Sequence, residues 1–484
     1  MINRARRSGA ILLGIVVLGV AVRALSAFGL SARTGLVSDA GRMAEEAAGW
    51  LTNGHPEAFY LPPGNTALLL LSQRLFGVGT LGPRIAMVLV SSLTVLFAAR
   101  LGGQLAGRRA MFWTGIVGAL YTPAVLLCGQ SYSQHLAGLC LVVFADQGFS
   151  AFRKGRVGAA VCAGLALGIG ALARPSTLSV APVALYFALT AMRRAQLPEH
   201  ASHGAADGLA SSDGVSHGAA DGLAFWMKTA LARRIALAAG VTAVVTGLCV
   251  LPAMLHNRAA GEGWAISTNN ERNLFLGNCQ FTPDYKTSHL AQRLPEELPD
   301  DVRDYLLRFE GKPDQRRLMR DAAVEYMLDN PGRTLYRTLS RARAFWGFDY
   351  LATRVVQQFG DGGARRIAPA LLALEAGCFL AVAALATVAL TRARQGFRRP
   401  LARWLLALVV AYQVPYLIAF ASGTYHFPVM GLVWPFAGVA LASLTKEGVR
   451  AFVSSVGVRG FAALAVLFAI QIEYAYQTLR MASP

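Results

Sequence analysis

The stretch "ILLGIVVLGVAVRALSAFGL", residues 11–30, is a long apolar run near the start of the chain. A helix of about 20 apolar residues is long enough to cross the hydrocarbon core of a bilayer. Runs of roughly 17–25 apolar residues recur along the rest of the chain. Because lipid offers the backbone no hydrogen-bond partner, each run is expected to be a helix. The sequence therefore predicts an all-α polytopic membrane protein.

The composition of the whole chain agrees with this interpretation. Of its 484 residues, 54% are hydrophobic and only 15% are charged, which is too apolar for an ordinary soluble protein. The first run comes after Arg4, Arg6 and Arg7, and in this it resembles a secretory signal peptide. Its length and the many later spans favour an uncleaved first span instead.

The alternation of apolar runs and polar loops predicts about 11 transmembrane helices. They are expected at residues 9–30, 82–101, 110–128, 132–152, 157–173, 176–192, 235–255, 367–391, 404–421, 428–445 and 459–475. The apolar piece at 65–76 is only about 12 residues long, which is too short to cross. If it did cross, Arg100, Arg108 and Arg109 would lie outside. We therefore predict a helix that lies on, or dips into, the outer leaflet.

The net charge of +19 raises the question of a nucleic-acid partner. The basic residues, however, cluster in short loops at every second span end, as the positive-inside rule requires. These clusters are Arg4–Arg7, Arg100–Arg109, Arg153–Arg156, Arg193–Arg194, Arg392–Arg403 and Lys446–Arg450. The charge thus indicates a lipid bilayer and no nucleic acid, with the N-terminus inside. The six cysteines show no CxxC spacing, so neither a metal site nor a disulfide framework is indicated.

The chain has three parts, and two long loops stand out among its polar segments. Residues 1–255 form an N-terminal transmembrane region, which contains the first outer loop, 31–81, and an inner loop, 193–234. The inner loop is rich in Gly, Ala and Ser and carries "SHGAADGLA" twice, at 202–210 and 216–224. Such a composition has little to bury, so we expect a disordered linker.

The second long loop, residues 256–366, has enough aromatic and apolar residues to form a small, mostly helical periplasmic domain. Its segment 315–327 has apolar residues at helical spacing. The sequence Asn330-Pro331-Gly332 then provides a helix stop. The third part, residues 367–484, is a C-terminal transmembrane region.

The polar residues of interest lie on the outer side of this topology. In "SDAGRMAEEAAGW", residues 38–50, Asp39 comes after the first span and is suited to cap a helix that begins at Gly41. Glu45 and Glu46 then fall in the first two turns, where the helix dipole favours negative charge. The residues alone favour capping or solvation of Asp39, with catalysis as the alternative.

Further candidates stand in other outer segments. His55 and Tyr60 lie in "NGHPEAFYLPPGN", where an ordinary turn histidine and an interface aromatic are the alternatives. Arg174 lies in "ALARPSTL" between two apolar runs, on the side where the positive-inside rule does not explain it. Its guanidinium could hold a lipid phosphate through a two-pronged contact, and a snorkelling arginine is the alternative.

Two later segments complete the set of candidates. Asn273 and Asn278 lie in "NERNLFLGN", which could form a strand or the edge of a polar cleft; asparagine suits sugar recognition and turns equally. Tyr425 and His426 lie in "SGTYHFPVMGLVWP" and could contact a phosphate or a sugar, with interface anchoring as the alternative. No P-loop and no Gly-rich nucleotide fingerprint is present. Chemistry outside the membrane without a nucleotide suggests a lipid-linked activated donor.

Six segments, in order along most of the chain, carry a family resemblance. They are "SDAGRMAEEAAGWLTNGHPEAFYLPPGNTALLLLSQRLFG", "GPRIAMVLVSSLTVLFAARLGGQLAGRRA", "GLALGIGALARPSTLSVAP", "NLFLGN", "VEYMLDNPGRTLYRTLSRARAFW" and "TYHFPVMGL". Together they resemble the bacterial GT-C glycosyltransferases that use polyprenyl-phosphate sugars, the superfamily of protein O-mannosyltransferases and aminoarabinose transferases. The resemblance implies a GT-C-like helix bundle with juxtamembrane helices and a small outer domain.

The resemblance also implies roles for individual residues. Asp39 takes the place of a catalytic aspartate, acting as general base or binding the acceptor. The piece at 65–76 takes the place of a second juxtamembrane helix. Arg174 is the first choice for binding the donor phosphate, and His426 and Tyr425 come next. The residues expected at the substrate cleft are His55, Tyr60, Glu45, Glu46, Asn273 and Asn278.

The sequence departs from the family pattern at two positions. Arg42 stands where many relatives have an aromatic residue, which alters the acceptor contacts, and Thr424 stands where many have arginine, which leaves the phosphate ligand open. No metal ligand or cofactor is assigned. A divalent cation held by Asp39 with Glu45 or Glu46 is the alternative, although acids at a helix start are usually dipole partners.

The predicted function is inverting transfer of a sugar from a polyprenyl-phosphate donor to an unknown envelope acceptor, which is a lipid, a glycan or a protein. The enzyme is expected in the bacterial inner membrane with its active site facing the periplasm. The alternative is a transporter or flippase of lipid-linked sugars, which would need an inverted repeat and broken or charged helices at the midplane. No clear repeat is present among the spans. A third hypothesis is a non-catalytic partner that binds the donor without turnover.

Overall fold

The computed structural model describes residues 2–196, 217–285, 298–312, 314–392 and 399–482, and these residues form helices and connecting turns without a strand. The first ten helices are α1 (Ile2–Leu25), α2 (Ser38–Thr52), α3 (Pro63–Phe76), α4 (Leu81–Ala106), α5 (Arg108–Leu120), α6 (Thr122–Leu127), α7 (Gln134–Lys154), α8 (Val157–Ala173), α9 (Ala181–Gln196) and α10 (His217–Ala259). The others are α11 (Asn270–Gly277), α12 (Asp300–Leu307), α13 (Gln315–Asp329), α14 (Pro331–Phe345), α15 (Leu351–Phe359), α16 (Gly362–Arg392), α17 (Pro400–Ile418), α18 (Phe427–Glu447), α19 (Val449–Ser454) and α20 (Gly457–Ala482). Short turns of other helix types are η1 (Ser26–Leu30), η2 (Ser31–Arg33), η3 (Pro175–Val180) and η7 (Gly423–His426).

Nine helical segments of the described chain are long and apolar enough to cross a bilayer. They are Gly9–Arg33, Leu81–Ala106, Gln134–Lys154, Pro175–Gln196, Thr229–Ala259, Gly362–Arg392, Pro400–Ile418, Gly423–Glu447 and Gly457–Thr478. The chain is thus an all-α polytopic membrane protein, as the sequence predicts. The number is lower than the expected 11 or so because α8 has only 17 residues and the span expected at 110–128 is not one helix.

The span expected at 110–128 is broken into α5 and α6. Tyr121 has an extended backbone between them (φ −62°, ψ 99°), and Pro123 stands in the first turn of α6. Proline has no N–H to donate to the carbonyl oxygen four residues earlier, here that of Ala119, and its ring clashes with that carbonyl group. The last carbonyl groups of α5 therefore need a donor from another element.

Arg23 of α1 supplies that donor. Its side chain is fully buried, with Nη2 2.9 Å from the carbonyl oxygen of Gly118 and Nη1 3.0 Å from that of Ala119. Its Nε also donates to the Ser91 hydroxyl at 2.7 Å. A charge inside a helix bundle is tolerated when its hydrogen bonds are satisfied in this way. Arg23 thus stabilises the broken helix and ties α1 to α4 and α5.

Replacing Arg23 with methionine is expected to lower the free energy of unfolding by about 2–4 kcal/mol, since two buried carbonyl groups at the end of α5 lose their donor. The measurement is thermal unfolding of the purified protein in nanodiscs. The control is Arg108→Met, which changes an exposed arginine at the start of α5. Equal melting temperatures for the two variants would show that Arg23 is not needed for the break.

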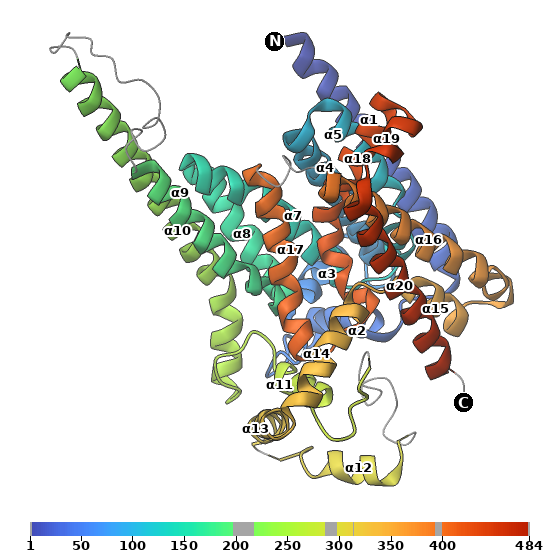
Figure 1. The fold of residues 1–484 in the computed structure, drawn as a ribbon. Coiled ribbons are helices and arrows are strands. Elements are labelled where there is room, and N and C mark those ends of the chain that lie inside the picture. Colours follow the sequence, from blue (N-terminus) through green and yellow to red (C-terminus); the bar gives the residue numbers. More distant parts are fainter. Residues whose placement is uncertain (1, 197–216, 286–297, 313, 393–398, 483–484) are drawn as a thin grey trace.

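The basic loops meet at one end of the bundle. Arg392 at the end of α16 donates to Glu447 at the end of α18 at 2.5 Å, and Arg399 before α17 donates to the carbonyl oxygen of Leu105 near the end of α4. We call this the linker end, because α10 also begins there (Figure 1). The opposite end, where α11–α14 gather, is called the domain end.

Helix α3 lies across the domain end. At its start, a Cβ on Gly64 would come within 2.6 Å of the carbonyl carbon of Leu172, so glycine allows α3 to pack against the last turn of α8. Gly82 at the start of α4 is close to Ser72 of α3 in the same way. A Cβ on Gly82 would lie 2.5 Å from the Ser72 carbonyl oxygen. The short helix predicted at 65–76 therefore exists, and it joins two helix ends instead of running through the bundle.

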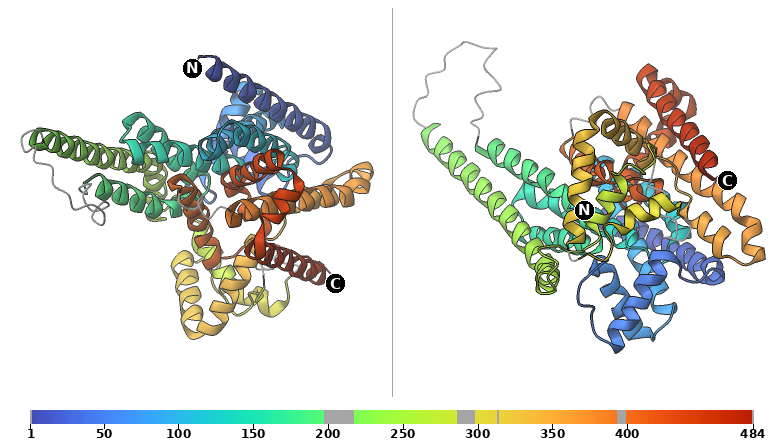
Figure 2. Two further views of the ribbon diagram at one scale, coloured as in Figure 1. Left: turned by 45° about the horizontal axis from the view of Figure 1, so that its top comes forward. Right: turned by 90° about the horizontal axis from the view of Figure 1, so that it is seen from below.

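The domain end also carries the helices of the region 256–366 (Figure 2). Helices α11–α13 and the segments beside them enclose a small core made of Phe275, Leu276, Cys279, Leu298, Val302, Leu306, Met319 and Ala323. The helix predicted at 315–327 is α13, and it ends at Asp329, before the predicted stop. A strand was one of two interpretations of the segment around 270–278, and it is wrong. The segment forms α11, whose helical geometry turns Phe275 and Leu276 into this core together.

The disordered linker expected at 193–234 is helical at both of its ends. α9 continues to Gln196 and α10 begins at His217. Residues between these two, with the first "SHGAADGLA" copy, lie outside the described residues. The second copy falls almost wholly in α10, which corrects the expectation. Alanine has the highest helix propensity, and a helix that already exists extends without a new nucleus.

Candidate functional site

Asp39 lies in the first turn of α2 with an exposed side chain. The helix begins at Ser38 and not at Gly41, and no side chain caps it, so the capping interpretation of Asp39 is wrong. Ser38 has a φ of +56°, which is the one left-handed backbone among the described residues other than glycine. Backbone strain of this kind costs about 1–3 kcal/mol and gathers at functional sites.

The turn before α2 is fixed by Gln130, a buried residue between α6 and α7. Its side-chain nitrogen donates to the carbonyl oxygen of Gly35 at 2.7 Å, and its side-chain oxygen accepts from the backbone N–H of Val37 at 3.3 Å. Gly41 lies so close to Leu36 that a Cβ would be 2.7 Å from the Leu36 carbonyl oxygen. These contacts hold the start of α2, and with it Asp39, in one position.

The turn between α6 and α7 is the centre of the site. The side-chain nitrogen of Asn65 in α3 donates to the carbonyl oxygen of Ser131 at 2.8 Å, which joins α3 to this turn. The hydroxyl of the next residue, Tyr132, is hydrogen-bonded to the Ser38 hydroxyl, and the charge of Asp39 acts on it. The Asp39 carboxylate therefore lies within electrostatic range of the Tyr132 hydroxyl.

Arg174 stands on one side of this turn, between α8 and η3. Its Nη1 donates to the Ser133 hydroxyl at 3.2 Å and its Nε to the Tyr416 hydroxyl at 3.3 Å. Its guanidinium carbon lies 5.5 Å from the centre of the Tyr425 ring, which is a cation–π contact. Within the described part of the chain no carboxylate pairs with it. Its positive charge is thus held in place but not neutralised.

Arg354 of α15 is a second arginine whose charge reaches this turn. It is half-buried, and its charge acts on Tyr132 and on Tyr350. Its guanidinium makes no hydrogen bond or ion pair with the residues that the structure describes. Arg354 is thus a second uncompensated cation beside the same tyrosine that Asp39 approaches.

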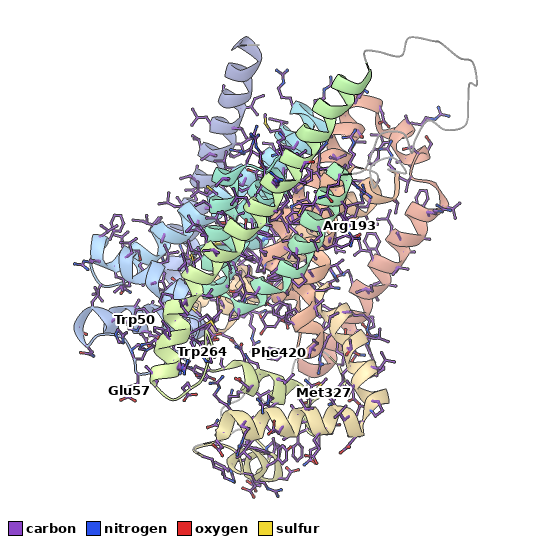
Figure 3. The ribbon with its side chains drawn as sticks, turned by 90° about the vertical axis from the view of Figure 1, so that its left-hand side faces the viewer. Trp50, Glu57, Arg193, Trp264, Met327 and Phe420 are labelled. Carbon is purple, nitrogen blue, oxygen red and sulfur yellow. The ribbon has the colours of Figure 1, made fainter. Side chains whose placement is uncertain are left out.

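Asp39, Arg174 and Arg354 are thus linked through two tyrosines at the domain end. The charge of Asp39 acts on Tyr132, which is in range of Arg354, and on Tyr425, which lies under Arg174. An exposed carboxylate can accept a proton, and unpaired guanidinium groups bind anions such as phosphate. Figure 3 shows Trp50, Trp264 and Phe420 gathered near this end of the molecule and Arg193 farther toward the linker end.

His426 does not belong to this group. It is completely buried, its Nδ1 is 2.7 Å from the carbonyl oxygen of Phe345, and its ring packs 4.6 Å from that of Phe379 and stacks on Trp346. The preceding residue, Tyr425, is half-buried and lies beside Arg174. The phosphate-binding role expected for His426 is corrected, because aromatic rings enclose the imidazole.

Asn278 is also structural. Its Nδ2 donates to the carbonyl oxygen of Ile418 at 2.9 Å, and Arg341 bonds both its Oδ1, at 3.1 Å, and the Ile418 carbonyl oxygen, at 2.7 Å. These bonds fasten α11 to the end of α17, so Asn278 is not free to bind a substrate as expected. Asn273 lies in the same helix, and its side chain is half-buried.

His55 and Tyr60 lie in a loop fixed on α10. The backbone N–H of Phe59 donates to Asn257 Oδ1 at 2.7 Å, and the rings of His55 and His256 meet edge to face at 4.7 Å. Tyr60 is exposed, and Arg42 of α2 lies over its ring at 5.2 Å. The arginine that departs from the family pattern is thus held by an aromatic residue of the next loop.

Glu45 and Glu46 have different surroundings. Glu45 is exposed, whereas Glu46 is half-buried, with Oε2 3.5 Å from the Thr66 hydroxyl. Burial raises the pKa of Glu46 above its ordinary value of 4.5, while the charge of Arg42 and the Thr66 hydroxyl act in the opposite direction. Among the described residues no three His, Cys, Asp or Glu side chains are grouped as metal ligands would be.

Sequence reasoning missed Tyr132, Ser133 and Arg354. The polar turn "GQSYSQH", residues 129–135, between two apolar runs was a usable signal for the first two. Arg354 had no local signal of this kind, because one arginine in a short helix of the outer region is ordinary. Its importance comes from its place beside a turn more than 200 residues earlier in the chain.

Comparisons with known proteins point to a fold and not to a sequence family. No family model matches the chain, and no curated protein matches it significantly. The oligosaccharyltransferase of Archaeoglobus fulgidus, solved with zinc and sulfate, matches with 13% identity and a TM-score of 0.50 over 94% of this chain and 52% of that one. The oligosaccharyltransferase AglB, also from Archaeoglobus fulgidus and solved with an inhibitory peptide and a dolichol-phosphate, matches with 15% identity and a TM-score of 0.47, over 96% of this chain and 55% of that one.

A third solved structure is ArnT from Cupriavidus metallidurans bound to undecaprenyl phosphate, with 15% identity, a TM-score of 0.39 and coverage of 90% and 78%. The chain spans about half the length of the oligosaccharyltransferase that it matches. At this level of identity the likeness concerns the fold. The chain has a GT-C-like fold of membrane helices similar to that of the archaeal oligosaccharyltransferase, as the resemblance of its sequence predicts.

Proposed function

We propose that this protein transfers a sugar from a polyprenyl-phosphate donor to an acceptor of the bacterial cell envelope, with inversion at the anomeric carbon. The supporting observation is an exposed carboxylate, Asp39, whose charge acts on Tyr132 and Tyr425. Each of these tyrosines is in range of an arginine that no described carboxylate neutralises, Arg354 and Arg174 respectively. Such a site can bind a phosphate and accept a proton at once. Those are the two tasks of this reaction.

In the proposed reaction an acceptor hydroxyl or amine attacks the anomeric carbon of the donor sugar. The bond between that carbon and the phosphate oxygen breaks, and polyprenyl phosphate leaves with the electron pair. Asp39 takes the proton from the acceptor, while Arg174 and Arg354 bind the phosphate oxygens as their negative charge grows. The Tyr416 and Ser133 hydroxyls accept hydrogen bonds from the Arg174 guanidinium and so fix its orientation during this step.

We further propose that the domain end faces the periplasm and that the membrane is the bacterial inner membrane. The basic loops gather at the linker end, which the positive-inside rule assigns to the cytoplasm. Asp39 and both arginines then lie on the side where lipid-linked sugars are used without a nucleotide. The acceptor would reach α2 and α3 from the periplasm.

Transfer in detergent distinguishes this function from transport. The purified protein is mixed with detergent-solubilised membranes of a deletion strain, in which the leaflets no longer exist, and lipids, glycans and envelope proteins are analysed by mass spectrometry. We expect one envelope component to gain the mass of a sugar as polyprenyl phosphate is released. If the sugar-modified envelope component forms only in intact vesicles, the protein is a transporter of the lipid-linked sugar and the proposal is wrong.

A further inference from the structure

Helix α15 begins inside the protein, where its first N–H groups have no water to bind. Glu375 of α16 accepts two of them: Oε1 is 3.2 Å from the backbone nitrogen of Ala352, and Oε2 is 3.1 Å from that of Thr353. The same Oε2 accepts the Thr353 hydroxyl at 2.7 Å. Glu375 is 1% exposed. A carboxylate from a membrane-spanning helix therefore caps the first turn of α15.

A second buried carboxylate, Asp349, caps the same turn. Its Oδ1 accepts from the backbone nitrogen of Leu351 at 2.9 Å and lies 3.5 Å from the Thr424 hydroxyl. Its Oδ2 is buried without a partner among the described residues. Burial raises the pKa of Asp349 to about 6, because its charged form is less well solvated here than in water. Neither Asp349 nor Glu375 forms an ion pair with any described basic residue.

Two buried acids are more than a helix start needs, because one Ser, Thr, Asn or Asp is the usual cap. The residues beside this turn indicate a second role for the two acids. Arg354 comes within the first turn of α15, with its backbone nitrogen 2.9 Å from the carbonyl oxygen of Tyr350. Thr424, which approaches Asp349, immediately precedes Tyr425, the residue under Arg174. Both acids thus hold the turn of α15 that carries Arg354.

We propose that Glu375 and Asp349 are positioning residues of the phosphate site: they fix the first turn of α15 and so direct the Arg354 guanidinium toward a phosphate bound beside Tyr132 and Asp39. This inference rests on the proposed function and adds how the orientation of the Arg354 guanidinium is fixed. Both acids act through Arg354 and do not touch the ligand. Their effect on phosphate binding therefore exists only while Arg354 is present.

A double-mutant cycle tests this dependence. The full chain in nanodiscs is titrated with undecaprenyl phosphate, and with undecaprenol as the probe that lacks the phosphate. Glutamine at position 375 keeps one acceptor oxygen and turns an NH₂ group toward a backbone N–H, so the first turn of α15 must shift. We expect Glu375→Gln to weaken undecaprenyl phosphate binding about tenfold, which is about 1.4 kcal/mol. In the Arg354→Met background the same change is expected to alter binding less than about twofold.

The matched control is Asp146→Asn. Asp146 is an equally buried carboxylate of a membrane-spanning helix, but it bonds Gln104 and Arg100, far along α7 from the site. It should leave the affinity for undecaprenyl phosphate unchanged. If Glu375→Gln does not fold, Thr353→Val removes only the 2.7 Å hydroxyl contact and should weaken binding in the same Arg354-dependent way.

The outcomes separate the two proposals. A wild-type protein that binds undecaprenol as tightly as undecaprenyl phosphate contradicts the proposed function. If the wild type prefers the phosphate and Glu375→Gln has no effect, the positioning role is wrong. If Glu375→Gln weakens binding equally with and without Arg354, the acids serve general stability alone, and the inference is again overturned.

Discussion

Replacing Asp39 with asparagine is expected to lower the rate of sugar transfer by about 10²–10⁴-fold, the usual contribution of a positioned general base. Asparagine has the same shape, so the first turn of α2 should keep its geometry and Ser38 its contact with Tyr132. The amide cannot take the acceptor proton. The measurement is the initial rate of product formation from lipid-linked donor in solubilised membranes.

Binding of undecaprenyl phosphate should not weaken in the same variant. The arginines bind the phosphate, and the change removes a negative charge that would repel it. The control is Glu45→Gln, which removes an exposed acid from the same helix and should leave the rate within about twofold of wild type. Undiminished transfer by Asp39→Asn would end its assignment as the base. A matching loss in Glu45→Gln would point to the overall charge of α2 instead.

The second large effect is expected at Arg174. Changing it to methionine should weaken undecaprenyl phosphate binding by about 10- to 100-fold, as hydrogen bonds to a charged group contribute about 1.5–3 kcal/mol. The guanidinium is already directed by Tyr416 and Ser133, so little freedom is lost when phosphate binds. Lysine should restore only part of the affinity, since it lacks the two-pronged geometry. The measurement is direct titration in nanodiscs.

Arg193→Met is the matched control for this experiment, because it removes an exposed arginine at the linker end. It should leave binding unchanged at moderate salt. Equal losses in the two variants would mean that lipid-phosphate binding depends on the total charge of the protein. A loss confined to Arg174 would support a built phosphate site.

The sequence was sufficient for most features that depend on local pattern. Apolar runs predicted the membrane helices, the short apolar piece at 65–76 predicted the short helix α3, and helical spacing predicted α13. The Tyr121–Pro123 break was missed because hydropathy averages over about 19 residues and a single proline changes the average little. Its partner Arg23 lies 95 residues from Gly118, and no local pattern reports such a contact.

The candidate site was predicted in part. Asp39, Arg174 and Tyr425 do come together, and each stands at an outer break between helices, where a polar residue is visible in the sequence. His426 and Asn278 stand at similar breaks but turn inward, and residue type does not tell these two directions apart. Only the three-dimensional contacts separate residues that fasten the helices from those left free to meet a ligand.

Locating a bound lipid phosphate is the most direct test of the proposed site. The measurement is a cryo-electron microscopy map of the full chain in nanodiscs with undecaprenyl phosphate. We expect the phosphate within hydrogen-bond distance of the Arg174 and Arg354 guanidinium groups and beside Asp39, with its lipid tail leading into the bilayer. A phosphate bound at the linker end, or at the domain end without contact to either arginine, would contradict the proposed site.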